Sequence, residues 1–267
     1  MDSFFIEGEG SIPVILHLPH NSTLMPDDWS VSLNSDVLHN EIHILVDHHT
    51  DILYHPILEM GGRVFHNRYC RIAFDPERFS DPQQEIMNEV GMGVFYTHTS
   101  DGIRFREDDS HEIYQKKLQQ YYWPYHNALS FETQNMLKKF GRVLFVDGHS
   151  YPKTCFSFER FPSDTRPEID IGTDPFHTPK EFVEDIYEIF SESYSVAIDQ
   201  PFRGTLIPNG FCNTDSRLWA MMLEVRRDVY LDRYDEGEIS LHHLNIEVFH
   251  KKLRHILTCY INNASCV

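Results

Sequence analysis

Residues 142–150, with the sequence RVLFVDGHS, decide the fold class of this 267-residue chain. This apolar, β-branched run ends in a histidine, which is typical of a buried strand that opens into a polar loop. Residues 12–18, IPVILHL, form a second run of this kind, which leads into Pro19 and His20. We therefore expect two buried strands with polar, chemically capable side chains just beyond their ends.

Apolar residues at helical spacing lie between these two strands. The spacing predicts a helical segment within residues 34–60, after the turn-prone Asn34. It predicts another over residues 110–140, capped by Ser110 and kinked at Pro124, because proline cannot donate to the preceding turn. Helices between strands favour a layered α/β arrangement.

The second half of the chain continues this alternation. Residues 179–193 predict a helix with Thr178 as N-cap and Pro179 in the first helical position. Residues 219–227, WAMMLEVRR, indicate a further strand, and residues 241–262 a terminal helix. We expect an α/β fold with a mixed sheet flanked by helices on both faces.

Length and composition indicate a single domain over residues 1–267. Hydrophobic residues make up 41% of the chain, and no linker-like segment divides it. The formal net charge of −18 argues against nucleic acid or an anionic membrane as partner, since binding phosphates requires clustered lysines and arginines. If the ligand is an anion, its attraction must come from local arginines.

The sequence also bears on location and on thiol chemistry. The N-terminal residues lack the basic and apolar regions of a signal peptide, and no window approaches the ~18 apolar residues of a membrane span. We therefore expect a cytoplasmic protein. The five cysteines form no CxxC pair, which predicts reduced, buried thiols and not a disulfide framework or a cysteine-rich zinc site.

Histidine and carboxylate side chains near the strand ends suggest a metal site. His20 and His149 each follow a strand, and Asp47 lies on or near the helix after the first one. In open α/β sheets the functional crevice lies beyond the carboxyl ends of the strands. Two imidazoles and one carboxylate leave a fourth position for water, as in catalytic zinc sites. The alternative is a strand-end histidine bonded to a backbone carbonyl.

Other histidines compete for this role. His39, His43 and Asp47 recur every four residues, as on one face of a helix. Further histidines in this part of the chain are His17, His48 and His49. A polar stripe at helical spacing is otherwise typical of a solvated helix face. The ligand set therefore stays open at this point.

Glu224 lies inside the apolar run MMLEVRR. An ionised carboxylate is costly to bury unless it is paired or takes part in chemistry. A glutamate beside a metal-bound water can accept its proton and pass it to a departing amine. The alternative is a structural ion pair with Arg226 or Arg227.

Arginines in two segments suit an acidic ligand. Residues 70–79, CRIAFDPERF, place Arg71 and Arg78 on either side of Asp75, and guanidinium groups bind carboxylates through paired hydrogen bonds. Arg203 lies in the turn-like PFRG segment and could contribute to the same site. The alternative for each is an ordinary surface arginine.

Taken in order, these segments resemble N-formylglutamate amidohydrolases and, more distantly, aspartoacylases and zinc carboxypeptidases. The resemblance rests on LPH at 18–20, DHHTDILY at 47–54, CRIAFDPER at 70–78, DGHS at 147–150, EIDIGT at 168–173, PFRGT at 201–205 and the segment from Glu224 to Tyr230. The order of about six motifs along most of the chain carries it, because no motif is decisive alone.

The resemblance implies a phosphorylase/hydrolase-like fold and zinc-dependent hydrolysis of the amide bond of an N-acyl amino acid similar to N-formyl-L-glutamate. It implies one Zn²⁺ per chain, held by His20, Asp47 and His149. The remaining implied roles are Glu224 as general base and then acid, Arg71 polarising the scissile carbonyl, Arg78 binding the substrate carboxylate, and Asp75 positioning that loop; Arg203 is a further substrate-binding candidate.

Two positions depart from the family pattern. Glu77 stands where the family has asparagine, and Thr205 replaces the second glycine of its turn. A negative charge beside Arg78 would repel an acidic substrate or neutralise the arginine. Glu77 thus favours the first alternative, a related metallohydrolase with peptidase-like or other N-acyl-amino-acid specificity. The second alternative is a binding protein that keeps the fold without turnover.

Overall fold

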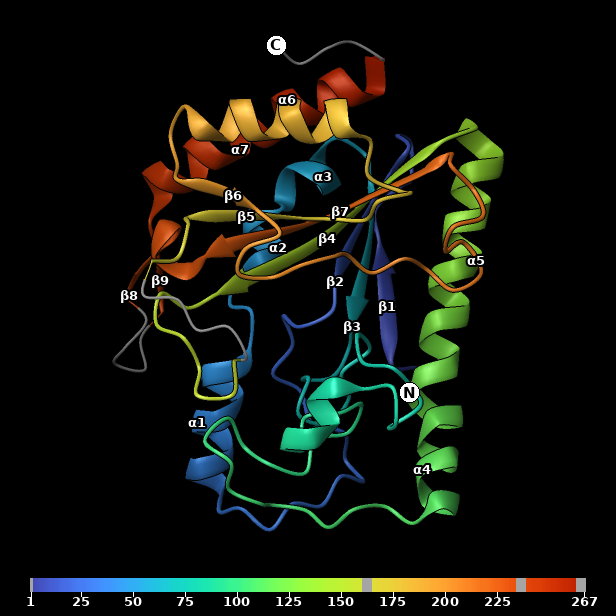
Figure 1. Ribbon diagram of the computed structural model, residues 1–267, viewed down its shortest axis with the longest axis vertical. Helices are drawn as coiled ribbons and strands as arrows, with labels where there is room; N and C mark the ends of the chain where they lie inside the picture. The colour runs from blue at the N-terminus through green and yellow to red at the C-terminus, as the bar shows by residue number, and fades with distance from the viewer. Residues whose placement is uncertain (1, 160–164, 234–238, 263–267) are drawn as a thin grey trace.

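The computed structural model describes residues 2–159, 165–233 and 239–262. Its strands are β1 (Phe4–Glu7), β2 (Val14–Leu18), β3 (Arg63–Asn67), β4 (Val143–Tyr151), β5 (Ile169–Thr173), β6 (Val196–Ile198), β7 (Leu218–Arg226), β8 (Leu231–Arg233) and β9 (Ser240–Leu241). The first seven form one sheet in the order β1-β3-β2-β4-β7-β5-β6 (Figure 1). Strands β3, β2, β4 and β7 run parallel, whereas β1 and β5 pair antiparallel with β3 and β7.

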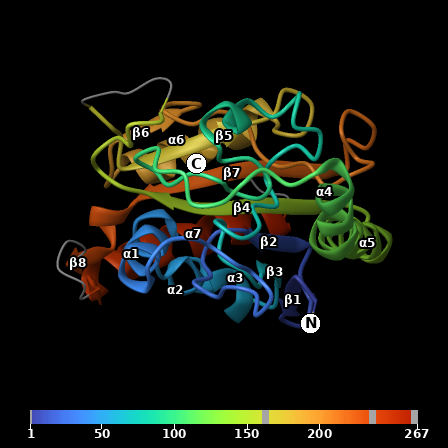
Figure 2. The ribbon, with the colours of Figure 1, turned by 90° about the horizontal axis from the view of Figure 1, so that it is seen from below.

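The helices cover both faces of this sheet. They are α1 (Ser35–Leu45), α2 (Thr50–Leu53), α3 (His55–Glu59), α4 (His111–Lys117), α5 (Trp123–Phe140), α6 (Lys180–Ser191) and α7 (His243–Asn262). Helices α6 and α7 lie side by side, and α4 continues into α5 as a long column along the sheet (Figure 1). Seen from below, α1, α2 and α3 gather on one side of the sheet (Figure 2). The mixed α/β fold flanked by helices is therefore confirmed.

Side-chain alternation along the strands builds two cores. Leu16 and Val146 point to one face, where they belong to a buried cluster with residues of α2, α3, α6 and α7, Phe249 among them. Their neighbours Ile15 and Phe145 point to the other face and pack in a cluster with residues of α5. Strands β2 and β4 are buried along their whole length, as expected for parallel strands covered on both sides.

The predicted strands are present at the centre of the sheet. Residues 12–18, 142–150 and 219–227 correspond to β2, β4 and β7, which lie next to one another. The helix predicted within 34–60 is interrupted, because α1 ends at Leu45 and His49 adopts a left-handed conformation with φ of 54° before α2. The short strands β1, β3, β5 and β6 carry no long apolar run and were not predicted.

The starts of α4 and α6 can be compared with the predicted N-cap residues. The Ser110 side chain accepts from the Ile113 amide at 3.4 Å, and a π-helical turn, Leu118–Tyr122, separates α4 from α5 just before Pro124. The N-cap prediction for α6 is wrong by one position, since Pro179 is the cap. The Thr178 hydroxyl instead donates to the Ala220 carbonyl at 2.5 Å, which ties the helix start to β7.

The described residues contain no helix that is long and apolar enough to cross a membrane. Four of the five cysteines are described, and all four are reduced. Cys70 and Cys259 are buried as predicted, whereas Cys155 is half-buried and Cys212 is exposed, so the prediction of buried thiols is wrong for these two. Cys266 lies outside the described residues.

Candidate active site

The carboxyl ends of β2, β4 and β7 bring three predicted residues together. Because β2 and β4 are adjacent parallel strands, His20 and His149 meet, with ring centroids 5.0 Å apart. The register of β4 and β7 pairs His149 with Glu224, so both side chains leave the same face of the sheet. All three are buried. The Tyr54 hydroxyl donates to the His149 carbonyl at 3.0 Å and fixes this strand end.

Asp47 joins the two histidines from the loop after α1. Its amide donates to the His20 carbonyl at 2.9 Å, which anchors the loop beside β2. Its Oδ2 lies 3.2 Å from Nδ1 of His149 and 3.8 Å from Nδ1 of His20, and its Oδ1 lies 3.3 Å from the Arg227 guanidinium. Burial opposes ionisation of Asp47, but the hydrogen bond from His149 and the nearby charges outweigh it and lower the pKa. Asp47 thus lies next to both predicted histidines.

Asp75 controls the orientation of His20. The Nε2 atom of His20 donates to Oδ1 of this buried carboxylate at 2.9 Å. The other oxygen, Oδ2, accepts from Arg71 at 3.0 Å and from the Tyr96 hydroxyl at 2.8 Å, with Arg78 at 3.5 Å. This leaves Nδ1 of His20, which is buried and has no hydrogen-bond partner among the described residues. A carboxylate on the far nitrogen is the usual support of a metal-ligating histidine.

Glu77 lies on the opposite side of both imidazoles from Asp47. Its Oε1 is 3.2 Å from Nε2 of His149, and its Oε2 is 3.5 Å from Nε2 of His20. These three residues offer ligand atoms within 4.8 Å of one another and could hold a metal, as could His17, Glu77 and Asp147; among the described residues, the trio with Asp47 does not form so close a group. Sequence reasoning treated Glu77 only as a neighbour of Arg78. The sequence signal was the position of Glu77 two residues after Asp75. In the structure, Oδ1 of Asp75 accepts a hydrogen bond from the Glu77 amide at 3.1 Å.

The competing histidines have other surroundings. The two ring nitrogens of His17 lie 2.7 Å from Oδ1 of Asp147 and 2.6 Å from the Tyr125 hydroxyl, which makes it a buried support beneath the site. His48 donates to the His43 carbonyl at 2.7 Å. His39 is an exposed residue of α1, and His49 precedes α2. The helical stripe from His39 to Asp47 is broken, since α1 ends before Asp47.

Glu224 is buried and its Oε2 has no hydrogen-bond partner in the described part of the chain. Burial raises its pKa to about 8, against the opposing charge of His149. The alternative of a structural ion pair does not fit the described contacts, because Arg226 pairs with Asp228 at 2.5 Å and Arg227 with Asp47. A carboxyl group that holds a proton near neutral pH is suited to proton transfer.

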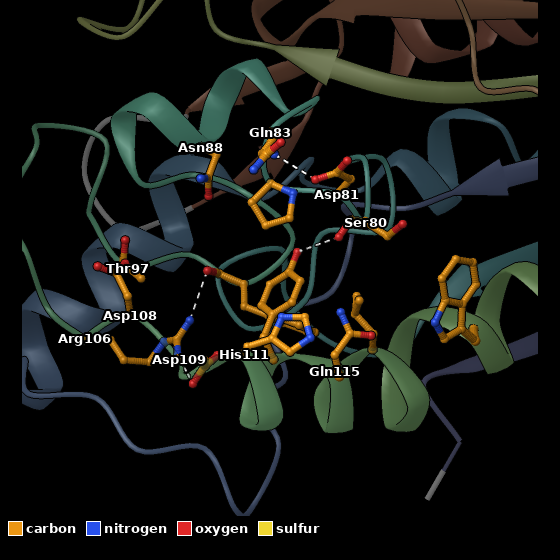
Figure 3. Close-up of a pocket in the computed structure, with 15 residues that line it drawn as sticks. Ser80, Asp81, Gln83, Asn88, Thr97, Arg106, Asp108, Asp109, His111 and Gln115 are labelled. Atoms are coloured by element: carbon orange, nitrogen blue, oxygen red, sulfur yellow. Dashed lines mark hydrogen bonds and ion pairs between the residues drawn. The ribbon is translucent and has the colours of Figure 1, made fainter.

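Arg203 is not part of this cluster of contacts. Its exposed side chain lines a different cavity of about 710 Å³ at the end of β5 and β6, together with Arg166 and Asp199. A further cavity of about 650 Å³ lies between residues 80–97 and α4 (Figure 3). The described residues that line these two cavities include no predicted site residue other than Arg203.

Comparison with known proteins shows which class of protein has this fold and site. It is the class of amidohydrolases, enzymes that hydrolyse an amide bond. Residues 12–231 match the family model described as N-formylglutamate amidohydrolase. This chain belongs to that family.

Two relatives carry matching names. N-formylglutamate deformylase of Pseudomonas putida is 23% identical over 245 residues, which cover 87% of this chain and 86% of that protein. The Pseudomonas aeruginosa enzyme of the same name is 23% identical over 239 residues, with 87% of both chains covered. The solved N-formylglutamate amidohydrolase of Ralstonia eutropha superposes with a TM-score of 0.83 at 20% identity, over 98% of this chain and 99% of that one.

A second solved structure supports the fold. A protein from Agrobacterium tumefaciens superposes with a TM-score of 0.69 at 18% identity, and covers 97% of this chain and 96% of that chain. At these identities the two structures establish the architecture, and the chemistry must be argued from the residues of this chain.

Proposed function

We propose that this chain hydrolyses the amide bond of a small N-acyl amino acid in a zinc-dependent reaction, with N-formyl-L-glutamate as the first substrate to test. The observation that carries the proposal is the buried, unpartnered Nδ1 of His20, which faces Asp47 beside His149 and close to Glu224. The names of the relatives support the substrate class. We also infer one catalytic domain over residues 1–267.

The residues present fit a zinc ion. His20, Asp47 and His149 would hold one ion per chain, because two imidazoles and one carboxylate match the donors that zinc prefers in catalytic sites. The Asp75 carboxylate on Nε2 of His20 keeps Nδ1 unprotonated and available. A bound zinc ion supplies Lewis-acid chemistry, since it lowers the pKa of a water molecule towards ~7 and polarises a carbonyl group.

Glu224 moves the proton in the proposed reaction. Its carboxylate takes a proton from the attacking water and delivers it to the nitrogen of the departing amine. The raised pKa of Glu224 suits the second step, because the protonated group can give its proton to the departing amine. Its position opposite His149 in the β4–β7 register keeps it beside the metal ligands.

Arg71 and Arg78 bind the charged parts of the reacting group in this proposal. Both side chains are 18% exposed, and both guanidinium groups contact the buried Asp75 carboxylate. Arg71 also donates from Nε to the Tyr96 hydroxyl at 3.1 Å, which fixes its plane. The two guanidinium groups share one carboxylate, so the cluster has an excess positive charge. This charge can stabilise the carbonyl oxygen through Arg71 and a carboxylate through Arg78.

Glu77 favours a second candidate, an amidohydrolase with another N-acyl-amino-acid specificity. Its carboxylate lies beside both histidines, and its side chain is 15% exposed. At this position it offsets the surplus positive charge of the arginine pair, which would weaken binding of a carboxylate there.

The experiment combines metal analysis with a substrate panel. Metal content of the purified protein is measured together with hydrolysis of N-formyl and N-acetyl derivatives of glutamate, glutamine and leucine, for wild type and His149→Ala. We expect one zinc per chain in wild type, and loss of both metal and turnover in the variant. Full activity in metal-free wild type would contradict the zinc chemistry. Metal binding without hydrolysis of any member would contradict the substrate class.

A further inference from the structure

Arg166 is a buried arginine with one edge unpaired. Its side chain is 1% exposed, and Nη1 donates to Oε1 of Glu159 at 3.0 Å. Nε and Nη2 are both buried and have no hydrogen-bond partner among the described residues. These two atoms form the edge of the guanidinium group that binds a carboxylate through two parallel hydrogen bonds. Buried polar groups are rarely left unpaired, so this edge calls for a ligand.

Aromatic packing holds the guanidinium group in place. It lies over the ring of Tyr151 at 4.7 Å and over that of Phe202 at 5.3 Å, and the two rings are 5.4 Å apart. The Arg166 carbonyl accepts from Arg226 at 2.6 Å, which fixes the backbone. Stacking satisfies the faces of the guanidinium group but gives its edge N–H groups no acceptor. The arginine is therefore preorganised for a ligand at that edge.

Arg166 packs against Tyr151, which lies on the same strand as His149. Tyr151 follows His149 by two positions on β4, so both side chains leave the same face of the sheet. On that face His149, Glu224 and Asp170 stand side by side across β4, β7 and β5. Arg166, which stacks on Tyr151, therefore lies further along the sheet face that carries His149 and Glu224.

The cavity beside Arg166 has a second cation. Arg166 and Arg203 line the same space of about 710 Å³. The carboxylate that also lines it, Asp199, is already engaged, because it accepts from the Thr173 amide at 2.9 Å and hydroxyl at 2.8 Å and from the Gly204 amide at 3.2 Å. Nη1 of Arg166 pairs with Glu159 and the donors to Asp199 are uncharged, so Arg203 is the added cation that would attract an anionic group to this space.

We propose that Arg166 binds the side-chain carboxylate of an acidic N-acyl amino acid, with Arg203 in the same cavity. This inference rests on the proposed function and names the group that recognises its substrate. The α-carboxylate is two bonds from the scissile nitrogen, so it must lie near Arg71 and Arg78. The side-chain carboxylate is further away and suits an arginine beyond Tyr151. Arg166 thereby becomes a specificity residue for acidic substrates.

The test compares two substrates of nearly equal shape. N-formyl-L-glutamate and N-formyl-L-glutamine differ in the charge of the side chain, and kcat/KM is measured for wild type, Arg166→Gln, Arg166→Lys and the control Arg217→Gln. Arg217 is a suitable control because it is 59% exposed and paired with Asp215. For Arg166→Gln we expect kcat/KM to fall about 10- to 100-fold with the acidic substrate, mainly through KM, and to stay within about threefold with the neutral one. Arg166→Lys should lie between, since lysine lacks the two-pronged edge.

A binding measurement without turnover separates the possible failures. Glutarate is titrated calorimetrically into metal-free wild type and the same variants, after thermal unfolding has confirmed that each is folded. Weaker glutarate binding in Arg166→Gln but not in Arg217→Gln is the expected result. Equal losses on both substrates, or unchanged glutarate affinity, would overturn the role of Arg166. If wild type hydrolyses neither substrate, the proposed function fails, and the titration still decides whether Arg166 binds a carboxylate.

Discussion

The Nε2 atom of His20 lies 2.9 Å from Oδ1 of Asp75, a carboxylate with no exposed surface that also contacts Arg71 and Arg78. Burial raises the pKa of Asp75, but the charges of Arg78, His20 and Arg71 outweigh it and hold the pKa well below its usual range. The pair therefore stays a carboxylate and an Nε2-protonated imidazole at neutral pH. Its effect is to leave Nδ1 of His20 unprotonated, as the proposed zinc site requires.

Asp75→Asn tests this support. The amide keeps the shape but removes the charge that fixes the His20 tautomer, so we expect zinc affinity to fall about 10- to 100-fold. Competition with a chromophoric chelator measures the dissociation constant. Asp51→Asn is the control, because Asp51 is an exposed acid of α2. Unchanged affinity in Asp75→Asn would show that Asp75 does not support a metal ligand.

Glu77→Gln tests how the carboxylate beside the two histidines acts. Removal of its charge restores the surplus positive charge of Arg71 and Arg78, so we expect kcat/KM for N-formyl-L-glutamate to rise about tenfold relative to N-formyl-L-glutamine, or about 1.4 kcal/mol. Zinc affinity is measured on the same sample. A tenfold or larger loss of zinc would instead mean that Glu77 is a ligand. An unchanged substrate ratio would remove it from specificity.

Asp170 predicts a pH dependence of stability. Burial raises its pKa from 3.8 to about 6, although the amides of Gln200 and Phe202 donate to its oxygens and oppose the shift. Because the folded pKa is the higher one, this contribution to stability is complete below about pH 4 and is lost as the pH rises through 6. The shift corresponds to about 3 kcal/mol at most.

The comparison with Asp170→Asn isolates that contribution. Free energies of unfolding from urea titrations of the metal-free proteins are measured at pH 4, 5, 6 and 7. We expect the stability of wild type relative to the variant to decrease across this range. A difference that stays constant with pH would mean that Asp170 titrates near its ordinary value when folded.

The sequence allowed the central part of the fold to be predicted because β2, β4 and β7 carry long apolar runs buried on both faces. Strands such as β3, RVFHN, and β5, IDIGT, are short and contain polar residues whose burial depends on neighbours far away in the chain. Their pairing could not be read from periodicity. Tertiary contacts decide such strands.

The candidate site was partly predictable for a related reason. His20 and His149 follow recognisable strands, and the position of Glu224 within an apolar run indicated its burial. The place of Asp47 depends on the end of α1 and on its amide contact with His20, which no local pattern encodes.

Arg166 shows the limit of sequence reasoning most clearly. Nothing in its local sequence distinguishes it from a surface arginine. Its role is inferred from the folded surroundings: the Glu159 contact on Nη1, the rings of Tyr151 and Phe202 at its faces, and the edge left without an acceptor among the described residues.

The most direct test of the central claim is the turnover of zinc-loaded Glu224→Gln with the best N-acyl amino acid of the panel, measured beside its zinc content. The account predicts that the variant keeps one zinc per chain, since Glu224 is not among the proposed ligands, while kcat falls about 10²- to 10⁴-fold through loss of proton transfer. Wild-type turnover with zinc retained would contradict Glu224 as the general base. Loss of zinc from the variant would contradict the proposed ligand set of His20, Asp47 and His149.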